Sequence, residues 1–294
     1  MDALTIAHFL GKKLYGHNIT ISNHSSLSNL TPNSVVFAKN LAFKTMEFLS
    51  KAKDIMVIAN GDSNLLEDLP LCFVLSKNPR LDFVKVVRHF FNETEVEEGI
   101  HPTAIIEKGA SICEGVSIGA HCFIGKDVSI GYNTIILPNV SIYGKVTIGE
   151  NCYLKPGVVI GGPGFGFEYD DDGTPLQFPH IGKVIIGDNV YIGANSTIDR
   201  ATIDATIIGD NVKIDNLVHI AHNCIVEKNA FVIAGTILSG GVTIGEKCWI
   251  SPNSTIHQKV KVGKNSTVGM GSVVLKKVKE NTTVFGNPAY KVEM

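Results

Sequence analysis

Residues 106–160 decide the fold, and they read IEKGASICEGVSIGAHCFIGKDVSIGYNTIILPNVSIYGKVTIGENCYLKPGVVI. An aliphatic residue stands at every sixth position, as at Ile106 and Ile112, and glycine often follows it directly, as at Gly119 and Gly125. A period of six fits neither a helix, which repeats about every 3.6 residues, nor a single strand, which alternates residue by residue. It predicts a prism with three short strands per coil, in which the aliphatic side chains fill the interior and glycine allows tight corners.

The repeat extends well beyond this stretch. It stops at Ile160, resumes at Ile186, slips by two residues between Ile203 and Ile208, and then runs to Val274. Three hexads of 6 residues make a coil of 18, so residue n is expected to stack on residue n+18. Such prisms resemble the left-handed parallel β-helix, and this resemblance implies a homotrimer with active sites in the grooves between neighbouring prisms.

Three regions follow from where the period holds. The first 99 residues lack it and predict a small α/β domain. Helical patterns lie at Thr5–Lys13, Thr45–Ala52 and Pro79–Phe91. Strand-like apolar runs lie at Ser34–Phe37, Asp54–Ala59 and Leu71–Leu75. We expect the β-helix over residues 100–285, with a Gly-rich and aromatic loop insertion at 161–185, and a C-terminal tail at 286–294. A loop of that length inside a regular repeat is uncommon without a function, although a surface decoration is the alternative.

Composition excludes several classes of function. Lys and Arg number 26 against 28 Asp and Glu, so the chain has no broad field that would attract nucleic acid or a membrane surface. No apolar run approaches the ~20 residues that span a bilayer, and Lys12 and Lys13 follow the first apolar stretch, the reverse of a signal peptide. We therefore expect a cytoplasmic protein without stable membrane insertion. Four of the six cysteines occupy small interior positions of hexads, where packing explains them.

One histidine stands out by its position. His222 comes two residues after the interior Ile220, at a corner that faces outward, and the stacking rule places Gly240 beside it. A base next to a peptide N–H that no side chain blocks is the minimum requirement for acyl transfer. The alternative is a structural corner histidine. A zinc site is a further alternative, but His219 and His222 form the only close pair and no third ligand is evident, so we expect no metal.

Several motifs carry a resemblance to a known family. They are G-F-G-F at 164–167, T-I-D-R at 197–200, K-I-D-N at 213–216 and I-A-H-N at 220–223. Together they resemble the UDP-3-O-acylglucosamine N-acyltransferases of lipid A synthesis over nearly the whole repeat region. The resemblance implies that His222 is the catalytic base, that the Gly240 amide is the oxyanion donor, and that Asp215 and Asn216 lie near the acceptor sugar. The carboxylate that orients His222 is left open, with Asp204 and Asp215 as candidates.

The N-terminal region shares the resemblance. The run SVVFAKNLAF at 34–43 is similar to the base-binding segment of that family, which implies a nucleotide-sugar-binding domain over residues 1–99. Phe37 and Phe43 would sandwich the uracil, and Asn40 would contact its edge. Aromatic faces and an amide edge suit a flat base, although both phenylalanines could instead belong to the core.

Two departures limit the resemblance. The family ends in a helical extension that docks acyl carrier protein, whereas this chain ends at Met294 after the run G-N-P-A at 286–289, which resembles sugar acetyltransferases that use acyl-CoA. A family histidine near the diphosphate is replaced by Lys259, which can bind phosphate as a point charge.

The sequence therefore predicts an N-acyltransferase acting on a UDP- or dTDP-linked amino sugar, for lipid A or another surface polysaccharide. The expected thioester co-substrate is acyl-CoA rather than acyl carrier protein, and no permanently bound cofactor is expected. The alternatives are a non-catalytic β-helix that binds nucleotide sugars or scaffolds partners, and a zinc-dependent hydratase.

Overall fold

The computed structural model describes residues 1–62, 64, 71–91 and 98–291, and the side chains of Phe43 and Lys44 lie outside the described part. The chain divides into two compact units, Met1–Glu95 and Val96–Met294. No helix among the described residues is long and apolar enough to cross a membrane.

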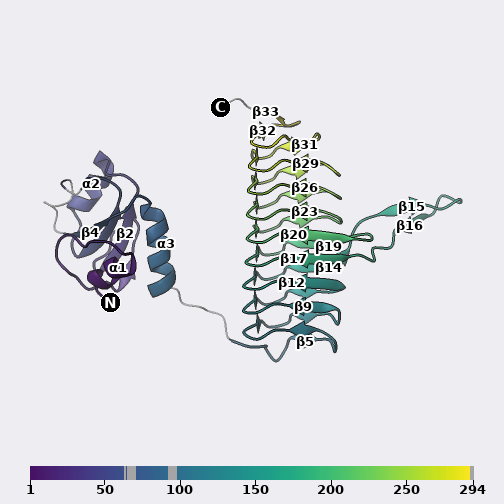
Figure 1. Cartoon of the computed structure of the whole chain (residues 1–294), viewed down its shortest axis with the longest axis horizontal. Coiled ribbons are helices and arrows are strands. Elements are labelled where there is room, and N and C mark those ends of the chain that lie inside the picture. The colour runs from purple at the N-terminus through teal and green to yellow at the C-terminus, as the bar shows by residue number, and fades with distance from the viewer. Residues whose placement is uncertain (63, 65–70, 92–97, 292–294) are drawn as a thin grey trace. The chain divides into compact units, whose positions relative to one another are not determined.

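The N-terminal unit is a parallel sheet with helices on both faces (Figure 1). Its elements are α1 (Ala3–Phe9), β1 (Asn23–His24), β2 (Ser34–Ala38), α2 (Phe43–Ser50), β3 (Ile55–Ala59), β4 (Cys72–Leu75) and α3 (Pro79–Phe90). Strand β3 is buried at every residue, as a central strand covered on both faces must be. Helix α3 begins where Asn78 accepts a hydrogen bond from the Leu81 N–H and Pro79 occupies the first turn. The predicted helices and strands are therefore present within a few residues, while the short β1 was not predicted.

The second unit is a parallel β-helix whose coils each contribute one strand to each of three sheets (Figure 1). The first sheet contains β7 (Ser117–Ile118), β10 (Ile135–Ile136), β13 (Tyr153–Leu154), β18 (Tyr191–Ile192), β21 (Lys213–Ile214), β24 (Phe231–Val232), β27 (Trp249–Ile250), β30 (Thr267–Val268), β32 (Thr283–Phe285) and β33 (Tyr290–Lys291). The second sheet contains β5 (Ile105–Ile106), β8 (Phe123–Ile124), β11 (Ser141–Ile142), β14 (Val159–Pro163), β19 (Thr197–Arg200), β22 (His219–Ile220), β25 (Ile237–Leu238), β28 (Thr255–Ile256) and β31 (Val273–Val274). The third sheet contains β6 (Ser111–Ile112), β9 (Val128–Ile130), β12 (Lys145–Ile148), β17 (Lys183–Ile186), β20 (Ala205–Ile208), β23 (Ile225–Val226), β26 (Thr243–Ile244) and β29 (Lys261–Val262).

The register of these sheets follows the predicted period. Ile220 pairs with Leu238, which pairs with Ile256, each one coil of 18 residues further on. The hexad aliphatics form one continuous core, and Ile220 and Leu238 are both 0% exposed. The coil that carries the insertion is longer, and there Ile160 pairs with Ile198.

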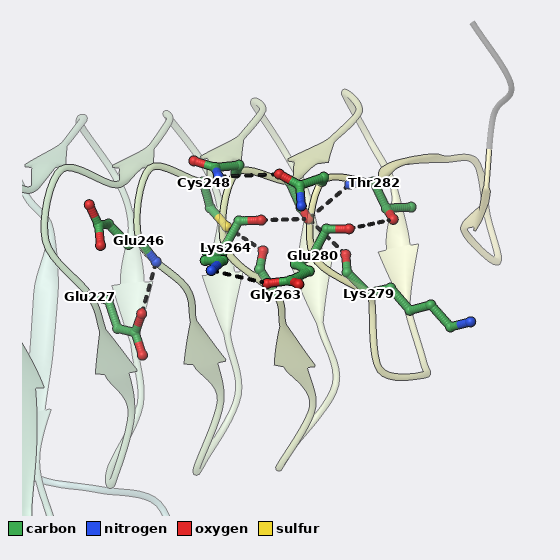
Figure 2. A network of polar contacts seen from close by, with 11 residues as sticks. Glu227, Glu246, Cys248, Gly263, Lys264, Lys279, Glu280 and Thr282 are labelled. Atoms are coloured by element: carbon green, nitrogen blue, oxygen red, sulfur yellow. Dashed lines mark hydrogen bonds and ion pairs between the residues drawn. The ribbon is translucent and has the colours of Figure 1, made fainter.

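Corners are closed by side chains that cap exposed peptide N–H groups. In Figure 2, the Glu227 carboxylate accepts from the Glu246 N–H at 2.9 Å, and an ion pair of 3.4 Å joins Lys264 to Glu280. The Cys248 thiol donates to the Gly263 carbonyl inside the corner. Corner peptides have no partner within their own strand, so this capping lets the chain turn without losing hydrogen bonds.

The insertion forms an antiparallel hairpin of β15 (Phe167–Tyr169) and β16 (Pro175–Gln177), which projects away from the prism in Figure 1. It leaves the prism after β14 and returns at β17. The stem of the hairpin, rather than its tip, lies against His222.

Candidate active site

The residues of interest share one edge of the prism. This edge, here called the His222 edge, consists of the corners that follow strands of the second sheet: after β14, β19, β22, β25 and β28. The insertion leaves from the first of these corners, His222 lies at the third and Gly240 at the fourth. A hexad period that keeps each strand in register therefore stacks distant parts of the sequence into one line.

His222 lies directly over Gly240, as the stacking rule predicts. A methyl group built on Gly240 would lie 2.7 Å from both Cε1 and Nε2 of His222. The His222 side chain is half-buried and faces outward. Only glycine leaves room for the imidazole at this position, so the ring edge faces the bare backbone of the next coil.

The tautomer of His222 follows from its neighbours. Asn223 Oδ1 accepts hydrogen bonds from the Thr202 N–H at 3.1 Å and from the Thr202 hydroxyl at 3.0 Å, which identifies that atom as the amide oxygen. The same oxygen lies 3.0 Å from His222 Nδ1. Because an amide oxygen can only accept, Nδ1 carries the proton and donates it. His222 Nε2 is left with a free lone pair over Gly240, where a general base is needed.

The Gly240 N–H is available to a ligand. At several corners of the first and third sheets the N–H two residues after the interior aliphatic is capped by a side-chain oxygen, as at Glu150, Ala194 and Glu246. The hydrogen bonds of the described residues include none from the Gly240 N–H. Its carbonyl, by contrast, accepts from the Lys259 N–H at 2.9 Å, which fixes the peptide. A fixed and unpaired N–H beside a base is suited to stabilise a developing oxyanion.

The stem of the insertion adds a second histidine, which the sequence did not predict. His180 packs edge to face against His222, with ring centroids 5.2 Å apart, and it is 4% exposed. Arg200 holds both ends of the stem, donating from Nε to the His180 carbonyl at 2.7 Å and from a guanidinium NH to the Gly161 carbonyl at 3.2 Å. Gly164 covers the two rings closely, since a methyl group there would lie 2.8 Å from His180 Nε2 and 3.0 Å from the His222 ring.

A half-buried carboxylate, that of Asp199, completes the cluster. Burial raises the pKa of the Asp199 carboxyl, against the opposing attraction of His219, His222 and His180. Asp199 Oδ2 lies 3.9 Å from His219 Nε2, and His219 Nδ1 lies 2.8 Å from the Thr197 hydroxyl. The His222 edge therefore gathers three imidazoles and one carboxylate whose pKa is raised, and ionisable groups clustered in this way are typical of functional sites.

Comparisons with known proteins identify the family of the chain. Residues 127–162 and 241–276 match the family model described as bacterial transferase hexapeptide (six repeats), and residues 183–220 match the hexapeptide repeat of succinyl-transferase. UDP-3-O-acylglucosamine N-acyltransferase from Coxiella burnetii is 34% identical over 241 residues, which covers 76% of this chain and 69% of the relative. UDP-3-O-acylglucosamine N-acyltransferase 1 from Legionella pneumophila is 33% identical over 79% of this chain and 70% of the relative.

The chain belongs to the UDP-3-O-acylglucosamine N-acyltransferase family. It is therefore an acyltransferase built on hexapeptide repeats, as the motifs predicted. Among solved structures, UDP-N-acetylglucosamine acyltransferase from Campylobacter jejuni matches with a TM-score of 0.60 and 28% identity, covering 67% of this chain and 75% of that one. The enzyme of that name from Francisella novicida matches with a TM-score of 0.60 and 31% identity, covering 66% of this chain and 68% of that one.

Two residues that the family resemblance assigned to the acceptor sugar lie elsewhere on the prism. Asp215 and Asn216 follow β21, so they stand at a corner of the first sheet rather than on the His222 edge. Asp215 accepts from the N–H groups of Asn216 and Ala234, and Asn216 accepts from the Ala194 N–H, so both side chains cap corners. Among the described residues, His222 contacts neither Asp215 nor Asp204, and its orienting partner is Asn223 instead.

Lys259, by contrast, stands on the His222 edge. It is exposed, and a methyl group on Gly241 would lie 3.3 Å from its Cγ. The Lys259 ammonium group lies one coil beyond Gly240, within reach of a ligand bound along the His222 edge.

The residues expected to hold a base belong to the N-terminal unit. Phe37 lies in β2, is half-buried and packs on Phe83 of α3 with ring centroids 5.1 Å apart. It lines a cavity of about 480 Å³ that includes His24, Asn29 and Phe83. Asn40 is exposed after the end of β2, and Phe43 begins α2, with its side chain outside the described residues. The sandwich of a base between Phe37 and Phe43 therefore stays a prediction.

Within the described residues, no group of three histidine, cysteine or acidic side chains is arranged to hold a metal ion. All six cysteines are free, and burial raises the pKa of the Cys224 thiol to about 12. The interior cysteines are therefore packing residues in the slots where the hexad pattern put them.

Proposed function

We propose that the chain transfers an acyl group from a thioester to the amine of a nucleotide-linked amino sugar, with His222 as general base and Gly240 as oxyanion donor. The observation that carries this proposal is the free Nε2 lone pair of His222 above the unpaired Gly240 N–H. Both groups are fixed before substrate binds, which is the condition under which such groups lower a barrier most.

The reaction balances with these two groups alone. The amine nitrogen attacks the thioester carbon, a C–N bond forms, and the carbonyl oxygen becomes an oxyanion that accepts from the Gly240 N–H. His222 Nε2 takes a proton from the attacking nitrogen. The C–S bond then breaks, and the departing sulfur takes that proton to leave as a free thiol. No permanently bound cofactor takes part in this scheme.

The acceptor we propose is a UDP-linked amino sugar of the kind named for the relatives, UDP-3-O-acylglucosamine, with a dTDP-amino sugar as the rival. Phe37, Asn40 and Phe43 would hold the base, Lys259 the diphosphate, and Asp215 and Asn216 the sugar. Because Asp215 and Asn216 stand at a different corner from His222, they would act from a neighbouring subunit. We therefore propose a left-handed homotrimer with active sites in the grooves between prisms, which the shared fold of the named acyltransferases supports.

The donor we propose is acyl-CoA, with acyl carrier protein as the rival. The run at Gly286–Ala289 supports acyl-CoA through its similarity to CoA-dependent sugar acetyltransferases. We place the reaction in the cytoplasm, where nucleotide sugars and acyl thioesters are available, and in the synthesis of lipid A or another surface polysaccharide. Mass measurement of the purified oligomer and a donor panel of acyl-CoA against acyl carrier protein test the assembly and the donor separately.

The deciding experiment measures acyl transfer by the His222→Ala variant. Loss of general-base help is expected to lower turnover by about 10²–10⁴-fold while the oligomer stays intact. His17→Ala is the matched control, since His17 is an exposed histidine of the N-terminal unit. Near-normal turnover of His222→Ala would refute the assigned role, and no product from any pairing of amino sugar and thioester would favour a binding protein instead.

A further inference from the structure

His180 presents an unusual lone pair. Its Nδ1 lies 2.8 Å from the Phe178 carbonyl oxygen, which can only accept, so Nδ1 carries the proton and donates it. In the neutral imidazole, Nε2 is then the acceptor. This atom is buried and has no hydrogen-bond partner among the described residues. Buried polar atoms are almost always paired, so an exception calls for a missing partner that can donate.

The surroundings of His180 Nε2 indicate which kind of hydrogen-bond donor would bind to it. Gly164 lies between the two histidines, and a methyl group there would contact both His180 Nε2 and the His222 ring. The His180 ring is oriented by its Nδ1 bond to the Phe178 carbonyl, and Arg200 holds the backbone carbonyl of His180. Asp199 adds negative charge on the same edge, since its carboxyl interacts with His180 and His222. Acceptors and a carboxylate gathered in this way suit a ligand that donates several hydrogens and carries positive charge.

An amine is such a ligand and a hydroxyl is not. A sugar ammonium group carries three N–H donors and a positive charge, whereas a sugar hydroxyl carries one donor and no charge. His222 Nε2 alone satisfies the single donor of a hydroxyl. A second acceptor beside it is useful only when the nucleophile has a second hydrogen to donate.

We infer that His180 Nε2 accepts an N–H of the acceptor amine and makes the site selective for amines over hydroxyls. This inference rests on the proposed function and names the group that the site selects. The amine reaches Nε2 when the Pro163–Gly166 segment shifts. The segment is held at its ends, where Pro163 pairs with Arg200 and the Gly166 carbonyl accepts from the Phe178 N–H, so the shift falls on Gly164 and on Phe165, whose side chain is 87% exposed. Gly164 is the part of this cover that lies against both Nε2 and the His222 ring.

The test uses two substitutions that separate the two nitrogens of His180. His180→Asn keeps a donor for the Phe178 carbonyl and loses the acceptor at Nε2, whereas His180→Gln extends an amide oxygen to where Nε2 stands. Calorimetric binding of UDP-glucosamine is compared with that of UDP-glucose, which differs only by a hydroxyl in place of the amine. Wild type is expected to prefer the amine. His180→Asn should lose that preference by about 10- to 100-fold, the range for a hydrogen bond to a charged group, and His180→Gln should retain most of it.

Equal binding of both sugars by wild type, no binding of either, or an unchanged preference in His180→Asn would overturn the inference. A purely structural histidine would instead make Asn the better substitute, since Asn keeps the bond to Phe178. Gly164→Ala should also lower the amine preference, because its methyl group would lie against Nε2, while Gly125→Ala, whose methyl group would meet Ile142 and Tyr143 at 3.3 Å and neither histidine, is the matched control. An amine preference without any turnover in wild type would contradict the proposed function and leave this inference standing.

Discussion

Gly240→Ala is the substitution for which the structure gives the clearest expected effect. Its methyl carbon would lie 2.7 Å from Cε1 and Nε2 of His222, whereas nonbonded heavy atoms rest at about 3.5–4.0 Å. The ring must therefore move by roughly 0.8 Å or rotate out of its bond to Asn223. The φ angle of Gly240 lies outside the left-handed region, so alanine adds no backbone strain and the fold should survive.

Two losses are expected from this one methyl group. A displacement of about 1 Å in a catalytic group costs on the order of 10²-fold in rate. Blocking one oxyanion donor costs about 10²–10³-fold. Because both act on the same step, we expect kcat/KM to fall by at least about 10²-fold rather than by the full product. Release of free thiol from the thioester donor measures the rate directly.

The controls separate a local effect from damage to the prism. Gly125→Ala lies far along the prism, and its methyl group would meet the nearest atoms at 3.3 Å, so its turnover should match wild type. In a His222→Ala background, Gly240→Ala should cost much less than it does alone, because the two residues act as a unit. Turnover of folded Gly240→Ala within about 3-fold of wild type would refute the geometry on which the mechanism depends.

Three further predictions follow from individual contacts. Asn223→Gly keeps the left-handed backbone of Asn223 (φ 60°) but removes the acceptor that sets the His222 tautomer, so kcat should fall by about 10-fold or more. Asn223→Asp keeps an acceptor, so its kcat should stay closer to that of wild type in the same assay. Burial raises the pKa of the Asp199 carboxyl above its ordinary value of 3.8. The protonated carboxyl therefore contributes stability that is fully present below pH 3.8 and is lost as the pH rises through the folded-state pKa. The Tm of Asp199→Asn, measured relative to wild type, should therefore increase as the pH rises through this range. A Tm difference that does not change with pH would contradict the raised pKa of Asp199. Ile250→Ala should lower the free energy of unfolding in urea by about 2–5 kcal/mol, because Ile250 is 0% exposed. Ile105 is 63% exposed, so Ile105→Ala should lower it by about 0.5 kcal/mol or less. Equal losses would contradict the interior placement of the hexad aliphatics.

The hexad rule predicted what the repeat itself determines. Ile220 lies inside, His222 faces outward and Gly240 stacks beside it, because strand pairing advances by one coil of 18 residues and the period leaves no other register. The same rule distinguishes corners. Asp215 comes one residue after an interior aliphatic of the first sheet, so it could have been separated from His222 by position alone.

The rest of the site lies outside the repeat, where no period applies. His180 reaches His222 only because the insertion returns to the corner from which it left, held by Arg200 at both ends. The sequence left the orienting partner of His222 open, with Asp204 and Asp215 as candidates. The partner is Asn223, whose left-handed φ brings its amide oxygen within reach of the preceding imidazole. Such a local backbone turn and the path of a long loop depend on tertiary contacts that residue spacing does not reveal.

A crystal structure of the protein with an amino-sugar nucleotide and a non-hydrolysable acyl-thioester analogue tests the central claim most directly. The distances that matter run from the sugar nitrogen to His222 Nε2 and from the acyl oxygen to the Gly240 nitrogen. Both are expected to fall within hydrogen-bonding range, about 2.6–3.2 Å. A sugar nitrogen bound away from the His222 edge, or an acyl oxygen held by another donor, would contradict the account.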